Sequence, residues 1–183
     1  MNEILKRHID SIKQEILSIQ SQGSFSHPVA LMGVTKYSNP PEIESLVNSG
    51  VTLLGENRIQ DAAQKIPLLS HLPVSWHMIG HLQTNKVKKA LNLFDCIQSV
   101  DSLKLALFID KESQKMNKIM PIFLQVNISC DDSKYGFSEE ELRELLPQLK
   151  LLSNVEIRGI MVIVKQTQDE LELRGYFNRA SVF

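Results

Sequence analysis

Short apolar segments of strand length alternate with helix-forming segments along most of this 183-residue chain. We expect strands at residues 29–34, 51–54, 74–79, 94–100, 119–128 and 155–164. Parallel strands need long crossover connections, usually helices, so the alternation favours an α/β fold with a parallel sheet. Six such units after a leading helix predict a TIM-like (β/α) barrel.

The first twenty residues predict the leading helix. Apolar residues recur there at intervals of four and three, which places them on one stripe of a helix. They are Leu5, Ile9, Ile12, Ile16 and Ile19. Capping-box signatures predict later helix starts at Ser138 with Glu141 and at Thr167 with Glu170. Pro147 should kink or shorten the helix that begins at Ser138.

The number of strands is too small for a closed barrel. A complete eightfold barrel has about 250 residues and rarely fewer than about 200. This chain supplies six strands where eight are needed for closure. We therefore expect a single domain over residues 1–183 that is incomplete at its C-terminal end and has unpaired sheet edges.

Charge and cysteine content exclude several classes of function. The chain has 20 basic and 21 acidic residues and a formal net charge of -1, without the basic excess typical of nucleic-acid binding. Cys96 and Cys130 are far apart and form no CxxC pair, which indicates reduced thiols in a cytoplasmic protein. No apolar run approaches the roughly 18 residues of a membrane span. Neither nucleic acid nor a membrane is an expected partner.

Polar residues lie near the carboxyl ends of several expected strands, where parallel α/β folds carry their functional groups. In chain order they are Lys36, Asn57, Arg58, His77, His81, Asn127, Ser129 and Lys134, and Met161 lies within the last expected strand. A lysine at such a strand end can attack an aldehyde once partial removal from water lowers its pKa and frees the neutral amine.

Lys36 is a candidate nucleophile on this argument, and Lys134 and Lys165 are its rivals. The acidic neighbours Asp131 and Asp132 favour the charged form of Lys134 and make it the weaker nucleophile. From position alone, an ordinary solvated surface lysine is the favoured interpretation of Lys36.

Two histidines and a basic run have weaker chemical interpretations. His77 and His81 are four residues apart, but they lie in an expected strand and glycine turn without an HExxH glutamate. A metal site is therefore not expected. Lys86, Lys88 and Lys89 are typical of a solvated helix face. No GxGxxG or P-loop motif predicts a nucleotide site.

Several longer motifs resemble, in order and spacing, those of the pyridoxal phosphate homeostasis proteins. The matching segments are residues 34–36, 55–60, 76–86, 99–102, 126–129 and 159–161. The GENR segment at 55–58 and the WHxIGHLQxNK segment at 76–86 are long and specific, whereas VTK at 34–36 alone would carry little information. The resemblance extends over the whole chain.

This resemblance implies a barrel of the alanine racemase N-terminal type that holds pyridoxal 5′-phosphate (PLP) as a lysine aldimine. It also implies a role without established turnover, in which the protein buffers PLP and delivers it to PLP-dependent apoenzymes. By resemblance, Lys36 is the aldimine lysine, Asn57 is a cofactor-pocket residue and Met161 lies by the pyridine ring. His81 is a further candidate for the pocket.

The sequence also departs from the family pattern. The family has two further strands, with a serine-rich and an RIG-like stretch that bind the phosphate and approach the ring nitrogen, and neither stretch occurs here. We expect this loss to weaken PLP binding by orders of magnitude, because each charge-assisted hydrogen bond contributes about 1.5 to 3 kcal/mol.

Two alternatives to a PLP carrier follow. One is a racemase-like enzyme, which would need a second acid/base such as Tyr37, Tyr135 or Tyr176. The lack of a second domain to supply an opposing base favours the carrier. The other alternative is a fragment with impaired cofactor binding.

Overall fold

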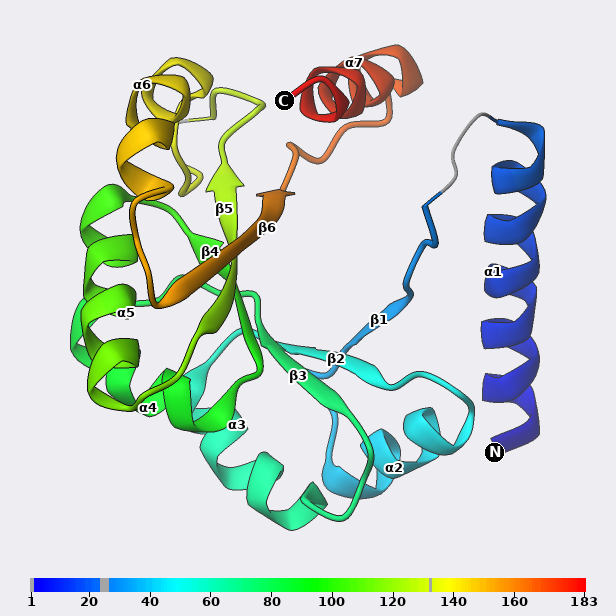
Figure 1. Ribbon diagram of the computed structural model, residues 1–183. Coiled ribbons are helices and arrows are strands. Elements are labelled where there is room, and N and C mark those ends of the chain that lie inside the picture. Colours follow the sequence, from blue (N-terminus) through cyan, green and yellow to red (C-terminus); the bar gives the residue numbers. More distant parts are fainter. Residues whose placement is uncertain (1, 24–26, 132) are drawn as a thin grey trace. The chain divides into compact units, whose positions relative to one another are not determined.

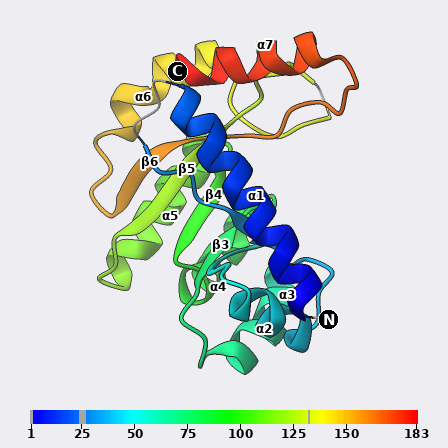
Figure 2. The same cartoon turned by 90° about the vertical axis from the view of Figure 1, so that its right-hand side faces the viewer.

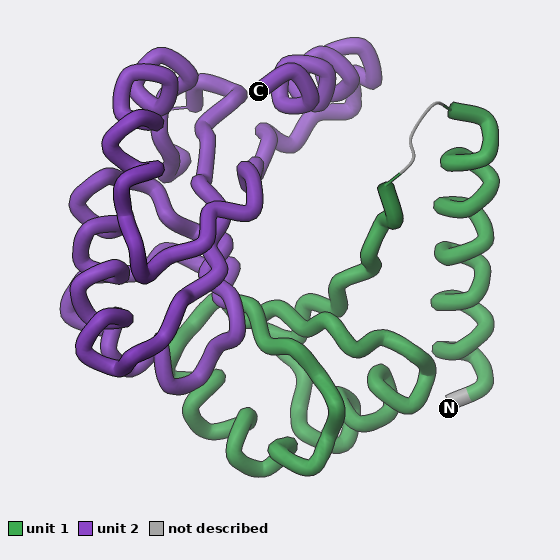
Figure 3. Tube along the Cα trace, in the orientation of Figure 1, with its two compact units in different colours: residues 1–77 green, residues 78–183 purple. Residues whose placement is uncertain are grey.

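The structure is a computed structural model that describes residues 2–23, 27–131 and 133–183. It divides into two compact units, residues 1–77 and residues 78–183 (Figure 3). Each unit combines strands with helices, as the alternating sequence pattern predicts (Figure 1). The expectation of one domain over residues 1–183 stays a prediction.

The first unit contains the leading helix, two further helices and two complete strands. Its elements are α1 (Asn2–Gln22), β1 (Met32–Val34), α2 (Pro40–Asn48), β2 (Leu53–Glu56), α3 (Ile59–Lys65) and the 3₁₀ helix η1 (Ile66–Leu69). Helix α1 confirms the predicted leading helix. Its apolar stripe is only partly buried, since Ile9 is buried whereas Ile12 and Ile19 are 43% and 59% exposed.

The second unit contains three complete strands and the C-terminal helices. Its elements are η2 (Thr84–Lys86), α4 (Val87–Leu93), β4 (Cys96–Val100), α5 (Leu103–Lys115), β5 (Met120–Val126), α6 (Glu139–Leu149), β6 (Val155–Val162) and α7 (Glu170–Ser181). Helices α6 and α7 lie side by side (Figure 2), where Arg179 forms an ion pair with Glu139 and the Arg143 guanidinium lies 4.5 Å from the Phe183 ring centroid.

Strand β3 (Ser75–Met78) lies across the boundary of the two units. The β1–β2, β4–β5 and β5–β6 pairs are parallel. The predicted α/β class, with six strands after a leading helix, is thus confirmed in the described part of the chain. No described helix is long and apolar enough to cross a membrane.

Helix α2 packs closely against β1 because the strand has a glycine at the point of contact. A Cβ atom on Gly33 would lie only 2.5 Å from Cδ2 of Leu46. Ile43 and Val47 of the same helix are buried. Two contacts therefore hold the short first strand: α2 packs on one of its faces, and its backbone pairs with β2.

The predicted start of the last helix was wrong in its capping residue. Asp169, not Thr167, is the N-cap of α7, and its carboxylate accepts hydrogen bonds from the backbone N–H groups of Leu171 and Glu172 at 2.9 and 3.2 Å. Aspartate is as good an N-cap as threonine and adds a negative charge where the helix dipole favours one. The Thr167 hydroxyl instead accepts from the Asp169 N–H.

Pro147 lies inside α6 and does not end the helix, whereas the predicted kink stays a prediction. Helix α6 begins after the predicted N-cap, Ser138, whose hydroxyl accepts from the Glu141 N–H at 3.0 Å. The helix continues through Pro147 to Leu149. Proline in the last turn removes a single N–H donor, so the buried Leu149 still anchors the end of the helix.

The two cysteines are free and differ in environment. Cys96 is buried in β4, and this burial raises the pKa of its thiol to about 12. Cys130 is exposed in the segment after β5. The expectation of unpaired thiols is confirmed.

We predict that iodoacetamide at mildly alkaline pH alkylates Cys130 and leaves Cys96 unmodified, because only a thiolate reacts and burial keeps the Cys96 thiol protonated. Peptide mass spectrometry before and after addition of denaturant measures both sites. Equal alkylation of the two cysteines in the native protein would contradict the burial of β4.

Candidate functional site

Lys36 lies in a tight turn directly after β1. The N–H of Ser38 donates to the carbonyl oxygen of Thr35 at 3.0 Å, so Lys36 and Tyr37 occupy the two central positions of a hydrogen-bonded turn. Both side chains are exposed, and the Lys36 ammonium lies 5.0 Å from the Tyr37 ring centroid. The partial removal from water expected for this lysine is not found, because the turn directs both central residues to the surface.

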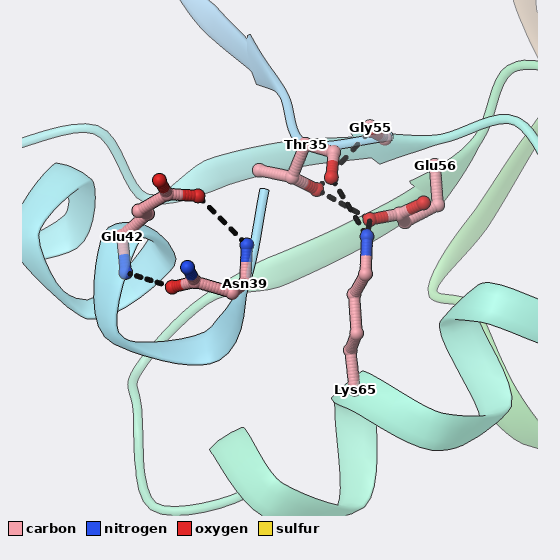
Figure 4. A network of polar contacts seen from close by, with 6 residues as sticks. All are labelled: Thr35, Asn39, Glu42, Gly55, Glu56 and Lys65. Carbon is pink, nitrogen blue, oxygen red and sulfur yellow. Dashed lines mark hydrogen bonds and ion pairs between the residues drawn. The ribbon is translucent and has the colours of Figure 1, made fainter. Parts of the chain in front are cut away.

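The turn is anchored on its strand side by a buried polar network (Figure 4). The Thr35 hydroxyl donates to Oε1 of Glu56 at 2.7 Å, and Nζ of Lys65 donates to the same oxygen at 2.9 Å. Lys65 also donates to the carbonyl oxygen of Thr35 at 2.8 Å. Glu56 is fully buried and only 14% of the Lys65 side chain is exposed. The residue before Lys36 is thus held by an ion pair inside the first unit.

A capping box holds the other side of the same turn (Figure 4). The Glu42 N–H donates to Oδ1 of Asn39 at 3.0 Å, and the Asn39 N–H donates to the Glu42 carboxylate at 2.8 Å. This reciprocal pair starts α2 immediately after the turn. Lys36 is therefore placed between a strand end and a helix start that are both fixed by side-chain hydrogen bonds.

Asn57 follows the neighbouring strand in the same unit. The parallel register pairs Val34 of β1 with Gly55 of β2, so Lys36 and Asn57 both lie just beyond the carboxyl ends of adjacent strands. Asn57 is half-buried, whereas Arg58 is exposed. The structure thus brings Lys36 and Asn57, both predicted from the sequence, to the same edge of the first unit.

His81 lies in the second unit with a carboxylate and a phenol ring as neighbours. Its Nδ1 is 2.8 Å from Oδ2 of Asp101, and its ring stacks on Tyr135 with centroids 3.9 Å apart. The carboxylate fixes the orientation of the imidazole and the stacked ring restricts its rotation. His81 and Asp101 border an open pocket of about 490 Å³ that is also lined by Gln83, Thr84, Asn85, Ser102 and Lys104.

Tyr135 is held by the segment that follows β5. Its carbonyl oxygen accepts from the Gln125 side chain at 3.0 Å, and the Asn127 N–H donates to the carbonyl of Phe137 at 2.9 Å. Gly136 has a φ of +132°, and a Cβ there would lie 2.8 Å from the backbone nitrogen of Asn127. Only glycine permits this segment to fold back onto the strand.

The remaining predicted residues lie in the second unit. Met161 is a half-buried residue of β6, paired in register with Gln125. The rival lysines Lys134 and Lys165 both lie near the carboxylate of Asp131. Hydrogen bonds from Ser133 lower the pKa of this carboxylate, and the positive charges of the two lysines lower it further. Asp132 lies outside the described residues.

No group of three or more histidine, cysteine or acidic side chains among the described residues is arranged to bind a metal ion. His77 lies in β3 and His81 lies after that strand, so the two histidines do not share a helix face. Their four-residue spacing is thus not the arrangement of two helical metal ligands.

Glu56, Lys65 and Asp101 have roles that the sequence analysis did not assign. Glu56 and Asp101 stand inside the motifs that carry the family resemblance, and this signal marked their segments without indicating a partner. Lys65 stands in no motif and faces Glu56 only because α3 returns along the sheet. Tertiary contacts determine which residues these side chains pair with, and sequence periodicity does not predict such contacts.

The fold and the strand-end residues define an α/β domain of the alanine racemase N-terminal type. The family model described as "Alanine racemase, N-terminal domain" matches residues 8–181 of this chain. A pyridoxal phosphate homeostasis protein of Helicobacter pylori is 35% identical over 174 residues, which span 94% of this chain and 78% of that relative. The chain belongs to the family of pyridoxal phosphate homeostasis proteins.

Solved structures agree with this assignment. PipY of Synechococcus elongatus, solved with PLP bound, is 35% identical and aligns with a TM-score of 0.80 over 93% of this chain and 79% of its own. An alanine racemase of Clostridium difficile, at 13% identity, aligns with a TM-score of 0.71 over 86% of this chain and 44% of its own. That second likeness concerns the fold alone.

We predict that Gly136→Ala destabilises the protein by about 1 to 3 kcal/mol, because an L residue is strained at this φ and its Cβ meets backbone atoms. Urea unfolding measures the change. Gly175→Ala in α7 is the matched control, since nothing lies within 4 Å of its added Cβ and alanine favours a helix by up to about 1 kcal/mol. Equal midpoints for the two variants would contradict the described backbone at Gly136.

Proposed function

We propose that this chain binds PLP covalently through Nζ of Lys36 and acts as a carrier in PLP homeostasis. The observation that carries the proposal is the position of Lys36: an exposed primary amine beyond the carboxyl end of β1, in a turn anchored on both sides. The family membership and the PLP-bound relative PipY support the choice of ligand.

The residues around Lys36 fit an aldehyde cofactor. PLP supplies an aldehyde carbon that condenses with a lysine ε-amine, with its carbonyl oxygen leaving as water. Lys36 contributes the amine, which loses two protons from nitrogen in this condensation. Its exposure gives the aldehyde access, and the hydrogen-bonded turn limits the backbone freedom lost on binding.

We further assign Asn57, His81 and Met161 to the cofactor pocket. Asn57 offers an amide beyond the strand next to that of Lys36. In His81, Nδ1 is engaged with Asp101, so Nε2 is the ring nitrogen to meet a ligand. Met161 offers a polarizable thioether suited to contact with an aromatic ring. Residues 1–183 then form one PLP-binding domain, and PLP-dependent apoenzymes are the recipients of the cofactor.

The first test is covalent capture of PLP. Incubation with PLP should give a visible absorbance band, and borohydride reduction should leave a pyridoxyl group on the peptide that contains Lys36. Lys36→Ala should lose both signals, because it removes the amine. Lys134→Ala and Lys165→Ala are the matched controls and should retain them, since these lysines lie by Asp131 in the other unit.

The mapped site decides this prediction. Labelling of Lys134 or Lys165 at the level of Lys36 would assign capture to general surface lysines. Loss of labelling in a cooperatively folded wild-type protein would overturn the proposed carrier function.

A second candidate function is racemase-like catalysis, and one observation favours testing it. His81, Asp101 and Tyr135 form a hydrogen-bonded and stacked group with acid/base side chains, and racemisation needs such groups on both faces of the substrate carbon. We predict no turnover, because Tyr135, a candidate for the second acid/base needed beside Lys36, is held stacked on the His81 ring.

Formation of D-alanine from L-alanine in the presence of PLP, measured by chiral chromatography, tests this prediction. A rate above that of free PLP that disappears in both Lys36→Ala and Tyr135→Phe would replace the carrier with an enzyme. A rate equal to that of free PLP supports the carrier.

A further inference from the structure

The Glu56–Lys65 ion pair is an unusual feature of the first unit because it is almost completely buried. The Glu56 side chain is 0% exposed and that of Lys65 is 14% exposed, with 2.9 Å between Oε1 and Nζ. A buried ion pair generally adds little stability compared with apolar side chains of similar size, since both charges must be removed from water. Stability alone is therefore a poor account of this pair.

The contacts of the pair converge on one residue, Thr35. Glu56 accepts from its hydroxyl and Lys65 donates to its carbonyl oxygen. The backbone N–H of Thr35 donates to the carbonyl of Gly55 at 3.0 Å. Every polar group of Thr35 is thus hydrogen-bonded, and two of the three are bonded to the ion pair.

Fixing Thr35 fixes the peptide group that leads into Lys36. The Thr35 carbonyl oxygen accepts from Lys65 and also from the Ser38 N–H that closes the turn. Rotation of this peptide would break both hydrogen bonds at once and leave Lys65 with one partner fewer in a buried position. The pair therefore restricts the backbone at the amine-bearing residue while the Lys36 side chain remains exposed.

We propose that Glu56, Lys65 and Thr35 are positioning residues for Lys36, and that the buried pair holds the Lys36 turn in the conformation that captures an aldehyde. This inference rests on the proposed function, because it concerns the same lysine. None of the three residues contacts the cofactor in this scheme. They act through the peptide bond between Thr35 and Lys36.

The pair also keeps this position free of net charge. Thr35 and Lys65 both use Oε1 of Glu56, and Oε2 has no hydrogen-bond partner among the described residues. Glu56→Gln retains an oxygen that accepts from Thr35 but leaves the Lys65 ammonium unbalanced.

The experiment compares four substitutions in the full chain. Thr35→Val removes only the hydroxyl donor, Thr35→Ser restores it, Lys65→Met removes the cation, and Glu56→Gln removes the anionic charge. Lys13→Met is the matched control, because Lys13 also donates to a backbone carbonyl in the first unit, that of Gly50 at 2.7 Å, away from the Lys36 turn. Two readouts are hydrogen exchange of the Ser38 amide and the rate of borohydride-trapped PLP capture on Lys36.

We expect Thr35→Val and Lys65→Met to raise Ser38 exchange and lower the capture rate, each by about tenfold, which corresponds to the loss of one net hydrogen bond. Thr35→Ser and Lys13→Met should match wild type. Glu56→Gln keeps an acceptor oxygen for both donors and should therefore impair both readouts less than Lys65→Met.

Wild-type exchange and capture rates in Thr35→Val would overturn the proposal, and so would a Lys13→Met variant as impaired as Lys65→Met. Should Lys65→Met fail to fold, the near-isosteric Thr35 variants still decide the result. The proposed function fails separately, if the folded wild type captures no PLP on Lys36. The positioning inference fails if wild type captures PLP and the Thr35 and Lys65 variants capture it equally fast.

Discussion

The parallel pairing of β1 with β2 is the constraint on which the candidate site depends. Its register places Val34 beside Gly55, so the next residues along the two strands, Thr35 and Glu56, come within hydrogen-bonding distance. The carboxylate of Glu56 is then buried and needs a cation, which α3 supplies through Lys65. Strand pairing thus buries the charge of Glu56, and this buried charge requires Lys65. Both side chains then bind Thr35, the residue before Lys36.

This arrangement separates rigidity from reactivity. The polar atoms that fix the turn are buried in the first unit, whereas the Lys36 amine is exposed and in contact with the Tyr37 ring. An exposed amine exchanges an aldehyde ligand readily with solvent, and a fixed backbone limits the entropy lost at each capture. Such a combination suits a protein that binds and releases a cofactor, and it differs from the desolvated lysine that the sequence suggested.

The second unit supplies a different kind of order. Its polar residues are organised by a backbone segment that folds back on β5, and this fold requires the positive φ of Gly136. The segment carries Tyr135 to the ring of His81, whose other contact is Asp101. Residues from the segments after β3, β4 and β5 are thus combined into one group by a glycine conformation and a stacking contact.

The sequence by itself determined the alternation of strands and helices, the leading helix, the N-cap at Ser138 and the placement of Lys36 and Asn57 at strand ends. These features depend on local periodicity and on short-range hydrogen bonds, which neighbouring residues encode. Only the tertiary structure decided that Lys65 pairs with Glu56 and that the Lys36 side chain stays exposed. The partner of a side chain and its burial depend on the distances between helices and strands. Periodicity along the chain does not predict these distances.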